Sequence, residues 1–385
     1  SDLVLSMYMT NDGFYYPYPW RNASSDVQDL GRGVNYFGAE MMSRSALREG
    51  RNLLPLAKMR TAGSPAGSPP VWTWYYNADY PTDYFAWGLS TLVGQIPLLS
   101  AIPTPPGGVR YEKFGASAAA MSIDGAVMQA RVALLFPSYS RNWNEGRAFA
   151  YRSELFGTAQ TLETMHIPYE LISDETLESG DLSKYRALFV GEAQCLSDRE
   201  IAAVKAFAAR GGKVRLSRTA GTRDEFGLPR SERAFGDESG LCYYEGYPAS
   251  PFELDETWAT HPWSFEPDES AEACFRQTLA EWTHGAVDWT IDAPSKVFTS
   301  VWREKSGSFV IHLLNGTGVN MKKGDPVLPD APNPPFPALT SDVLITAPAG
   351  VCGAAVAVSP DFDGEIPLVV RNAPDGRKVF VLPAN

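Results

Sequence analysis

Carboxylates stand at the ends of apolar segments in the first third of the chain. Glu40 closes the apolar segment 34–40, and Asp12 lies in the loop that follows the apolar segment 3–9. Cleavage of a glycosidic bond needs two carboxyl groups, one to protonate the leaving oxygen and one to attack the sugar or activate water. An apolar setting raises the pKa of a carboxyl group and keeps it protonated for the first role. Glu40 and Asp12 are therefore the candidate catalytic residues.

Structural roles for these carboxylates stay open at this point. Glu40 precedes Arg44 by one helical turn, so the two side chains could pair and hold a loop. Asp12 is followed by Gly13, and Asp-Gly is common turn chemistry. Asp79 comes just before an expected helix, where N-capping explains an aspartate without any catalytic role.

Aromatic residues make up 12% of the chain, and sugar rings stack on aromatic faces. Trp20 lies in a loop with two prolines, where burial in a core is hard to arrange. Trp74 and Tyr76 belong to the segment 71–76, in which alternate residues share a face. Asn77 and Asp79 follow that segment and could bond sugar hydroxyls. These five residues form the predicted substrate-binding set.

The bulk composition excludes several classes of partner. The net charge of −12 argues against nucleic acid and against an anionic membrane, because both require a basic face. No apolar run approaches the ~20 residues of a membrane span. A carbohydrate substrate fits the composition better than either.

No metal and no cofactor are predicted. The histidines and the four cysteines are scattered, without the spacing of metal ligands. The loop 137–143 lacks the glycines that cradle phosphates, which argues against a nucleotide or flavin. The cysteines show no disulfide framework, so the compartment stays open, with the bacterial cytoplasm favoured over secretion. The first residues match no signal peptide and enter a strand directly, which predicts a further segment upstream.

The first part of the chain reads as strand–helix pairs. Apolar segments at 3–9, 34–40, 71–76 and 96–102 predict strands, and the helical spacing between them predicts helices. Four such pairs amount to half of an eight-stranded barrel. A four-stranded open sheet is the alternative.

The middle of the chain predicts a doubly wound, flavodoxin-like parallel domain. Strands are expected at 131–138, 167–172, 185–190 and 213–216, with a helix at about 145–165. A second helix opens with a capping box at Ser197 and Glu200 and ends at a Gly-Gly pair. Class I glutamine amidotransferases share this layout, but Cys195 lacks the glycine-flanked elbow of their nucleophile. An assembly role is therefore expected.

After residue 286 the apolar pattern changes to alternation. Short strands are expected at 296–303, 308–314, 343–347, 351–358, 366–371 and 378–382, separated by Gly, Pro and Asp. This pattern predicts an antiparallel β-sandwich of about a hundred residues.

Two stretches carry a resemblance to a known family. The string YRALFVGEAQCLSDREIAAVKAFAARGGKV at 185–214 is similar to the trimerisation domain of family 42 β-galactosidases. The string SFVIHLLNGTG at 308–318 resembles the first hairpin of that family's C-terminal sandwich. The resemblance implies that residues 1–125 are the C-terminal half of a (β/α)8 catalytic barrel. It implies a flavodoxin-like trimerisation domain with an irregular extension at 126–285, and a β-sandwich at 286–385.

The resemblance implies a glycoside hydrolase acting on a β-linked glycoside, a homotrimer, and a missing N-terminal half of the barrel. In the family, the nucleophilic Glu ends the seventh barrel strand, whereas the corresponding segment 71–76 leads to Asn77 and Asp79. The family's acid/base Glu follows the fourth strand, which this chain lacks. A non-catalytic carbohydrate-binding or assembly subunit with a degenerate barrel is therefore the second hypothesis. The sugar, the linkage and the stereochemical course stay open.

Overall fold

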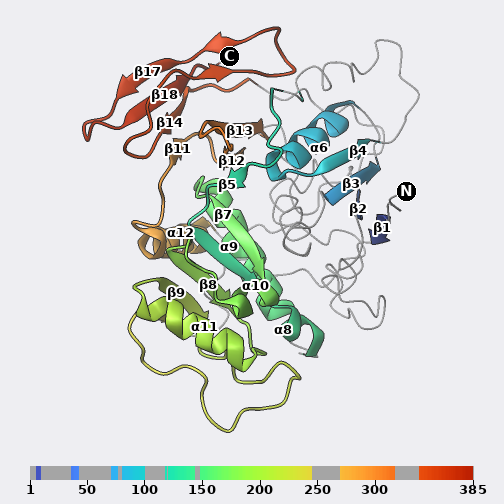
Figure 1. Ribbon diagram of the computed structural model, residues 1–385, viewed down its shortest axis with the longest axis vertical. Coiled ribbons are helices and arrows are strands. Elements are labelled where there is room, and N and C mark those ends of the chain that lie inside the picture. The colour runs from blue at the N-terminus through green and yellow to red at the C-terminus, as the bar shows by residue number, and fades with distance from the viewer. Residues whose placement is uncertain are drawn as a thin grey trace.

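The computed structural model describes residues 6–9, 36–42, 71–76, 80–99, 118, 120–143, 148–244, 269–316 and 338–384. These residues form a mixed α/β structure in which two parallel sheets and several antiparallel strands follow one another along the chain. Figure 1 shows the first sheet beside the helix α6, the second sheet in green, and the C-terminal strands in red at the far end.

The first sheet has four parallel strands in chain order, β1-β2-β3-β4. Its described helix, α6 (Tyr80–Val93), lies between β3 and β4 in the chain. Sequential parallel neighbours joined by helices are what consecutive strand–helix units produce. The strand bounds are Ser6–Met9 for β1, Tyr36–Met42 for β2, Val71–Tyr76 for β3 and Ile96–Leu99 for β4.

The second sheet has five parallel strands in the order β10-β9-β8-β6-β7. Counted along the chain, its strands stand in the order 2-1-3-4-5, one of the two common orders of doubly wound sheets. The order reverses between β6 and β8, so the chain winds outward in both directions from that point. The bounds are Val132–Phe136 for β6, Tyr169–Ser173 for β7, Ala187–Gly191 for β8, Lys213–Ser217 for β9 and Leu241–Tyr244 for β10.

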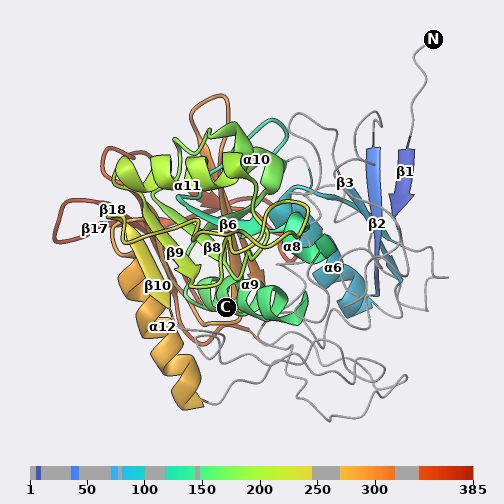
Figure 2. The ribbon, with the colours of Figure 1, turned by 90° about the horizontal axis from the view of Figure 1, so that it is seen from below.

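Helices cover both faces of the second sheet. In Figure 2, α10 (Asp174–Ser179) and α11 (Asp198–Ala209) lie on one side, and α9 (Ala148–Thr164) and α12 (Glu269–Thr283) lie on the other. All five residues of β6 are buried as a result. Burial on both faces explains why this strand reads as a continuous apolar run rather than an alternation.

The capping box predicted for α11 is present. The Ser197 hydroxyl accepts a hydrogen bond from the backbone N–H of Glu200 at 3.2 Å, and a carboxyl oxygen of Glu200 accepts from the N–H of Ser197 at 2.7 Å. Two backbone donors at the start of the helix are thereby satisfied. The Ser197 hydroxyl also donates to Glu178 at 2.7 Å, so the cap ties α11 to α10.

Ser197→Ala is expected to lower the free energy of unfolding by about 1 kcal/mol, because it removes this N-cap. Urea titration followed by circular dichroism measures the change. Ser183→Ala, in an exposed turn, is the matched control and is expected to stay near the wild-type value. Equal stability of the two variants would contradict a stabilising role for the cap.

The C-terminal strands form two larger antiparallel sheets with a common core. One has the order β11-β14-β18-β17, and the other has the order β13-β12-β5. Trp289 next to the first sheet meets Phe309 of the second edge to face, with ring centroids 5.0 Å apart. The bounds are Thr290–Asp292 for β11, Val343–Thr346 for β14, Lys378–Leu382 for β18, Val369–Asn372 for β17, Val297–Arg303 for β12, Phe309–Asn315 for β13 and Val127–Met128 for β5, with β15 (Val356–Ala357) and β16 (Ile366–Pro367) as a separate pair.

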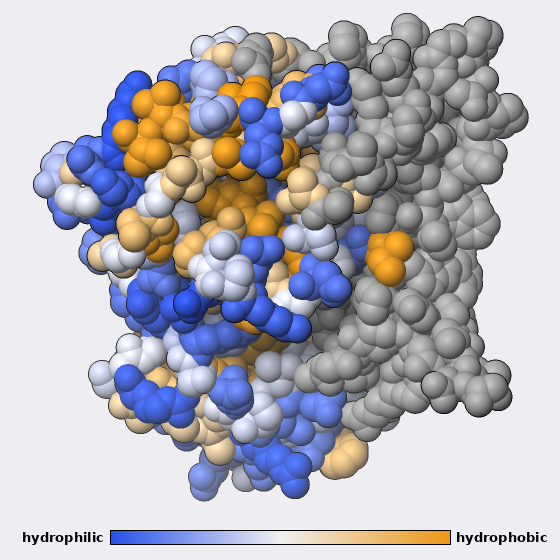
Figure 3. All heavy atoms as spheres, turned by 45° about the horizontal axis from the view of Figure 1, so that its top comes forward, coloured by the Kyte–Doolittle hydropathy of each residue, from blue (hydrophilic) through white to orange (hydrophobic). Residues whose placement is uncertain are grey.

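Strand β17 lies at the edge of its sheet, and all four of its residues are exposed. Figure 3 shows apolar side chains gathered on the C-terminal side of the molecule. Val369 and Val370 are exposed apolar side chains of β17. Exposed apolar surface at an open sheet edge favours contact with another chain.

The first and last units touch through α6. Gly88 of α6 lies so close to β13 that a Cβ at this position would stand 2.6 Å from a methyl group of Leu314. The Nε2 atom of His312 lies 2.9 Å from the carbonyl oxygen of Met121, a contact that gives this histidine a structural role. Burial lowers the pKa of His312 and keeps the ring neutral.

Several elements depart from the sequence expectation. The short helices α8 (Ser138–Trp143) and α10 were not predicted, and neither were β5 and β10. Helices of six residues show too little periodicity to be recognised. Strand β2 extends to Met42, so Glu40 lies two residues before its end rather than at it.

Candidate active site

The carboxyl edge of the first sheet brings predicted site residues to neighbouring positions. Because the strands are parallel, their carboxyl ends meet at one edge. Glu40 of β2 pairs in register with Trp74 of β3, and Met42 pairs with Tyr76. Trp74 in turn pairs with Leu98 of β4. Positions 40, 74 and 76 therefore lie together near the end of two adjacent strands.

The other predicted site residues lie outside the described residues. Asp12, Trp20, Asn77 and Asp79 belong to this group. In the chain, Asn77 and Asp79 follow the end of β3 and precede the start of α6. The catalytic and binding roles assigned to all seven residues stay predictions.

A second set of polar residues lies at the carboxyl edge of the five-stranded sheet. Asp174, which follows β7, accepts a hydrogen bond from the backbone N–H of Ser138 at 2.8 Å. Burial and the nearby Asp174 carboxylate raise the pKa of Glu200 to about 10, and burial raises that of Asp174 to about 6. Two buried carboxyl groups side by side favour a state in which one of them keeps its proton.

Glu154 is a further buried carboxyl group, on the helix α9. Burial and the charge of Glu192 raise its pKa to about 9, and Arg215 opposes that shift. Glu192 accepts a hydrogen bond from the Thr219 hydroxyl at 2.5 Å. Glu154 could not be recognised from the sequence, because a single acidic residue within an expected helix gives no sign that it is buried.

Cys195 has the environment of a structural residue. Its thiol belongs to a buried side chain, and burial raises its pKa to about 11. The Ser140 hydroxyl accepts from the Cys195 backbone N–H at 2.9 Å. A nucleophilic cysteine needs a lowered pKa, so this environment agrees with the absence of a nucleophile elbow.

Within the described ranges, no three His, Cys, Asp or Glu residues are placed to hold a metal ion. The helices of the same ranges include none that is long and apolar enough to cross a membrane.

The fold resembles those of glycoside hydrolases, as the two stretches of sequence implied. An α-L-fucosidase isoenzyme of Paenibacillus thiaminolyticus matches with a TM-score of 0.59 at 14% identity, over 94% of this chain and 65% of its own. A β-galactosidase from Bacillus circulans sp. alkalophilus matches with a TM-score of 0.59 at 10% identity, over 99% of this chain and 63% of its own. A catalytic mutant of a GH42 β-galactosidase from G. stearothermophilus matches with a TM-score of 0.55 at 11% identity, over 94% of this chain and 61% of its own.

Because the sequence identities are all below 15%, these similarities show a shared fold and nothing more specific. The chain spans less than two thirds of the length of each of these structures. No protein-family profile matches the sequence, and a search of curated proteins also gives no match.

Proposed function

We propose that this chain is the C-terminal portion of a glycoside hydrolase whose site lies at the carboxyl edge of the first sheet. The observation that carries the proposal is the register of β2 and β3, which sets Glu40 beside Trp74. A carboxyl group next to an aromatic position is the minimum for protonating a glycosidic oxygen on a stacked sugar. Glu40 takes the role of general acid, and Asp12 supplies the second carboxylate.

Trp20, Trp74 and Tyr76 form the sugar platform in this proposal, with Asn77 and Asp79 as partners for hydroxyl groups. The substrate is a β-linked glycoside or oligosaccharide. Support comes from the two β-galactosidases among the similar structures, while the fucosidase indicates that the same fold accepts other sugars.

The proposal also gives each unit a role. The first sheet is half of a (β/α)8 catalytic barrel. The five-stranded unit is a flavodoxin-like trimerisation domain, supported by its 2-1-3-4-5 strand order. The C-terminal strands form a β-sandwich, supported by the core that the two antiparallel sheets share.

A panel of aryl glycosides, β-galactosides and α-fucosides included, tests the proposal. The full chain is expected to release the aryl group from at least one β-linked member, and the absorbance of the released group measures this reaction. Mass spectrometry checks the mass of the protein in the same sample. Absence of hydrolysis across the panel, together with saturable quenching of tryptophan fluorescence by saccharides, would replace the enzyme by a binding subunit. Absence of both would remove the carbohydrate function.

The second candidate, a non-catalytic carbohydrate-binding or assembly subunit, is favoured by one specific observation. The segment after β3 contains Asn77 and Asp79, where the family's pattern has a nucleophilic Glu. A sheet that keeps its aromatic positions but lacks one of the two carboxylates could bind sugars without cleaving them.

A homotrimer is part of the proposal, with contacts through the five-stranded unit. Phe226 and Leu228 are 64% and 61% exposed at the tip of a hydrogen-bonded loop, next to the 54% exposed Trp143. Large exposed apolar side chains on a rigid turn are typical of subunit contacts. The Asp224 carboxylate holds the turn by accepting from the N–H groups of Phe226 and Leu228.

The double variant Phe226→Ser, Leu228→Ser is expected to dissociate the trimer. Burying two such side chains contributes a few kcal/mol per contact, enough to shift the dissociation constant by roughly a hundredfold. Light scattering of the wild type should give a mass of three times 42.1 kDa, and the mass of the variant should approach that of one chain. A wild-type monomer, or a variant that stays trimeric, would contradict this contact.

A further inference from the structure

A pocket lies at the amino edge of the five-stranded sheet, opposite the edge with the buried carboxyl groups. It has a volume of about 290 Å³ and is formed where β8 and β9 begin and where the helices α11 and α12 end. Its apolar lining includes Leu182 and Phe207. Its polar lining is basic, with Arg186, Arg210, Lys213 and His284 and without any acidic residue.

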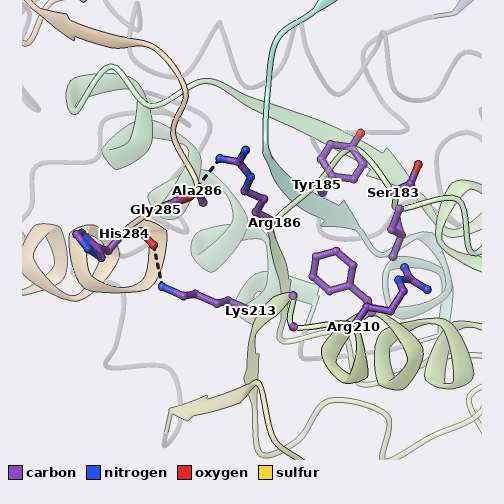
Figure 4. A pocket seen from close by; sticks show the side chains of 12 residues that line it. Ser183, Tyr185, Arg186, Arg210, Lys213, His284, Gly285 and Ala286 are labelled. Carbon is purple, nitrogen blue, oxygen red and sulfur yellow. Dashed lines mark hydrogen bonds between the residues drawn. The ribbon is translucent and has the colours of Figure 1, made fainter. Parts of the chain in front are cut away.

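Two of these cations are held in place by the end of α12. The Lys213 ammonium donates to the carbonyl oxygen of His284 at 2.8 Å. Arg186 donates to the carbonyl oxygen of Gly285 at 3.3 Å and pairs with Asp288 at 2.8 Å. Each side chain keeps further N–H donors after these bonds. Figure 4 shows both reaching toward the end of α12, while Arg210 extends from α11 on another side of the pocket, near Ser183.

Arg210 differs from the other two. In the described part of the chain, its exposed guanidinium group has neither a carboxylate nor a carbonyl partner. A planar guanidinium group with five donors is suited to an oxygen-rich anion. Arg210 is the C-cap residue of α11, so its charge also favours the end of this helix. Its side-chain donors remain available to a ligand at the rim of the pocket.

The charges around the pocket remain positive after its neighbours are counted. Arg131 and Arg186 share the carboxylate of Asp288, and the Ser183 hydroxyl bonds to Asp181. Glu170, which accepts a hydrogen bond from the lining residue Tyr185, pairs with Lys184, so these two charges cancel. The other four cations, Arg131, Arg186, Arg210 and Lys213, exceed the two remaining carboxylates by two charges. The ends of α11 and α12 bring roughly half a negative charge each, about one in total. The pocket therefore keeps a surplus of about one positive charge, although the net charge of the whole chain is −12.

We infer that this pocket binds a tetrahedral oxyanion, a phosphate or sulfate group carried by a small molecule. The cations line different sides of the pocket (Figure 4), and a tetrahedral group offers oxygens in several directions, whereas a carboxylate presents two oxygens on one side. The apolar lining suits a compact organic body, and the volume limits it to a small one. The inference is independent of the proposed hydrolase, whose site lies on a different sheet.

Calorimetric titration of the full chain with inorganic phosphate, sulfate and acetate at constant ionic strength tests the inference. We expect one saturable site per chain for phosphate or sulfate, with acetate bound several-fold more weakly. Arg210→Gln should weaken that binding by roughly 10-fold or more, because a hydrogen bond to a charged group is lost. Ser183→Glu should weaken it similarly, because it puts a carboxylate at the pocket.

Arg199→Gln, which removes an exposed cation from the other end of α11, is the matched control and should bind as the wild type does. Thermal melts show whether each variant is folded. The absence of saturable binding by the wild type would overturn the inference, and so would equal affinities of the Arg210, Ser183 and Arg199 variants. Acetate bound as tightly as phosphate would overturn the tetrahedral assignment.

Discussion

Glu40→Gln is expected to reduce turnover of a cleavable glycoside by about 10²- to 10⁴-fold, the usual contribution of a general acid. The substitution keeps the size and hydrogen-bonding capacity of the side chain but removes its transferable proton. Binding of the sugar, which depends on the aromatic positions beside Glu40, should change little. Steady-state rates and fluorescence titration on the same samples separate the two effects.

The control for this prediction is Glu365→Gln, an exposed carboxylate just before β16. It should match the wild type in both measurements. Unchanged turnover in Glu40→Gln would remove Glu40 from the site. If Glu40→Gln lowered the melting temperature as well as the turnover, Glu40 would instead have the structural role of holding a loop with Arg44.

Stability is expected to fall as the pH rises from about 5 to 9. Glu154 and Glu200 have pKa values of about 9 and about 10 in the folded protein, both raised chiefly by burial. A carboxyl group with a raised folded pKa contributes full stability below its unfolded pKa, and this contribution is lost as the pH approaches the folded pKa. Each group can remove up to ~1.4 kcal/mol per pH unit in that window.

At acidic pH, stability is expected to change in the opposite direction and to fall as the pH falls. Burial lowers the pKa of His166 and of His312, so their protonation destabilises the fold when the pH falls below the usual range of histidine. Stability should therefore be greatest near pH 5 to 6. Thermal melts across pH 4 to 9 at constant ionic strength measure the profile.

Glu154→Gln should flatten the alkaline part of this profile and raise the melting temperature at pH 8, because the amide carries no charge to bury. Glu232→Gln, on an exposed loop, is the control and should keep the wild-type slope. A wild-type melting temperature that stays constant between pH 5 and 9 would show that neither carboxyl group is held protonated.

Much of the fold follows from local patterns in the sequence. The strand β3 was predicted with the bounds Val71–Tyr76 that it has, and the cap of α11 was predicted residue by residue. Both rest on interactions within a few residues, namely alternation and capping. The resemblance to family 42 β-galactosidases, inferred from two short stretches, is confirmed at the level of the fold.

Contacts between residues that are far apart in the sequence could not be predicted from such local patterns. The pairing of Val127–Met128 with β12 joins residues that are about 175 positions apart, and no local signal records it. The burial of Glu154 depends on a sheet and a helix packed against it. The basic pocket collects Arg186, the neighbouring Arg210 and Lys213, and His284 from three separate places in the chain. Such sites appear only once the strand order is known.

The most direct test of the proposed site is hydrogen exchange measured by mass spectrometry, with and without the saccharide that quenches tryptophan fluorescence most strongly. We predict slower exchange in peptides that cover β2 and β3, including Glu40 and Trp74, because the sugar would lie over the carboxyl ends of these strands. Peptides from the five-stranded sheet should not change. Protection confined to the five-stranded sheet or to the C-terminal strands would contradict a carbohydrate site at the edge of the first sheet.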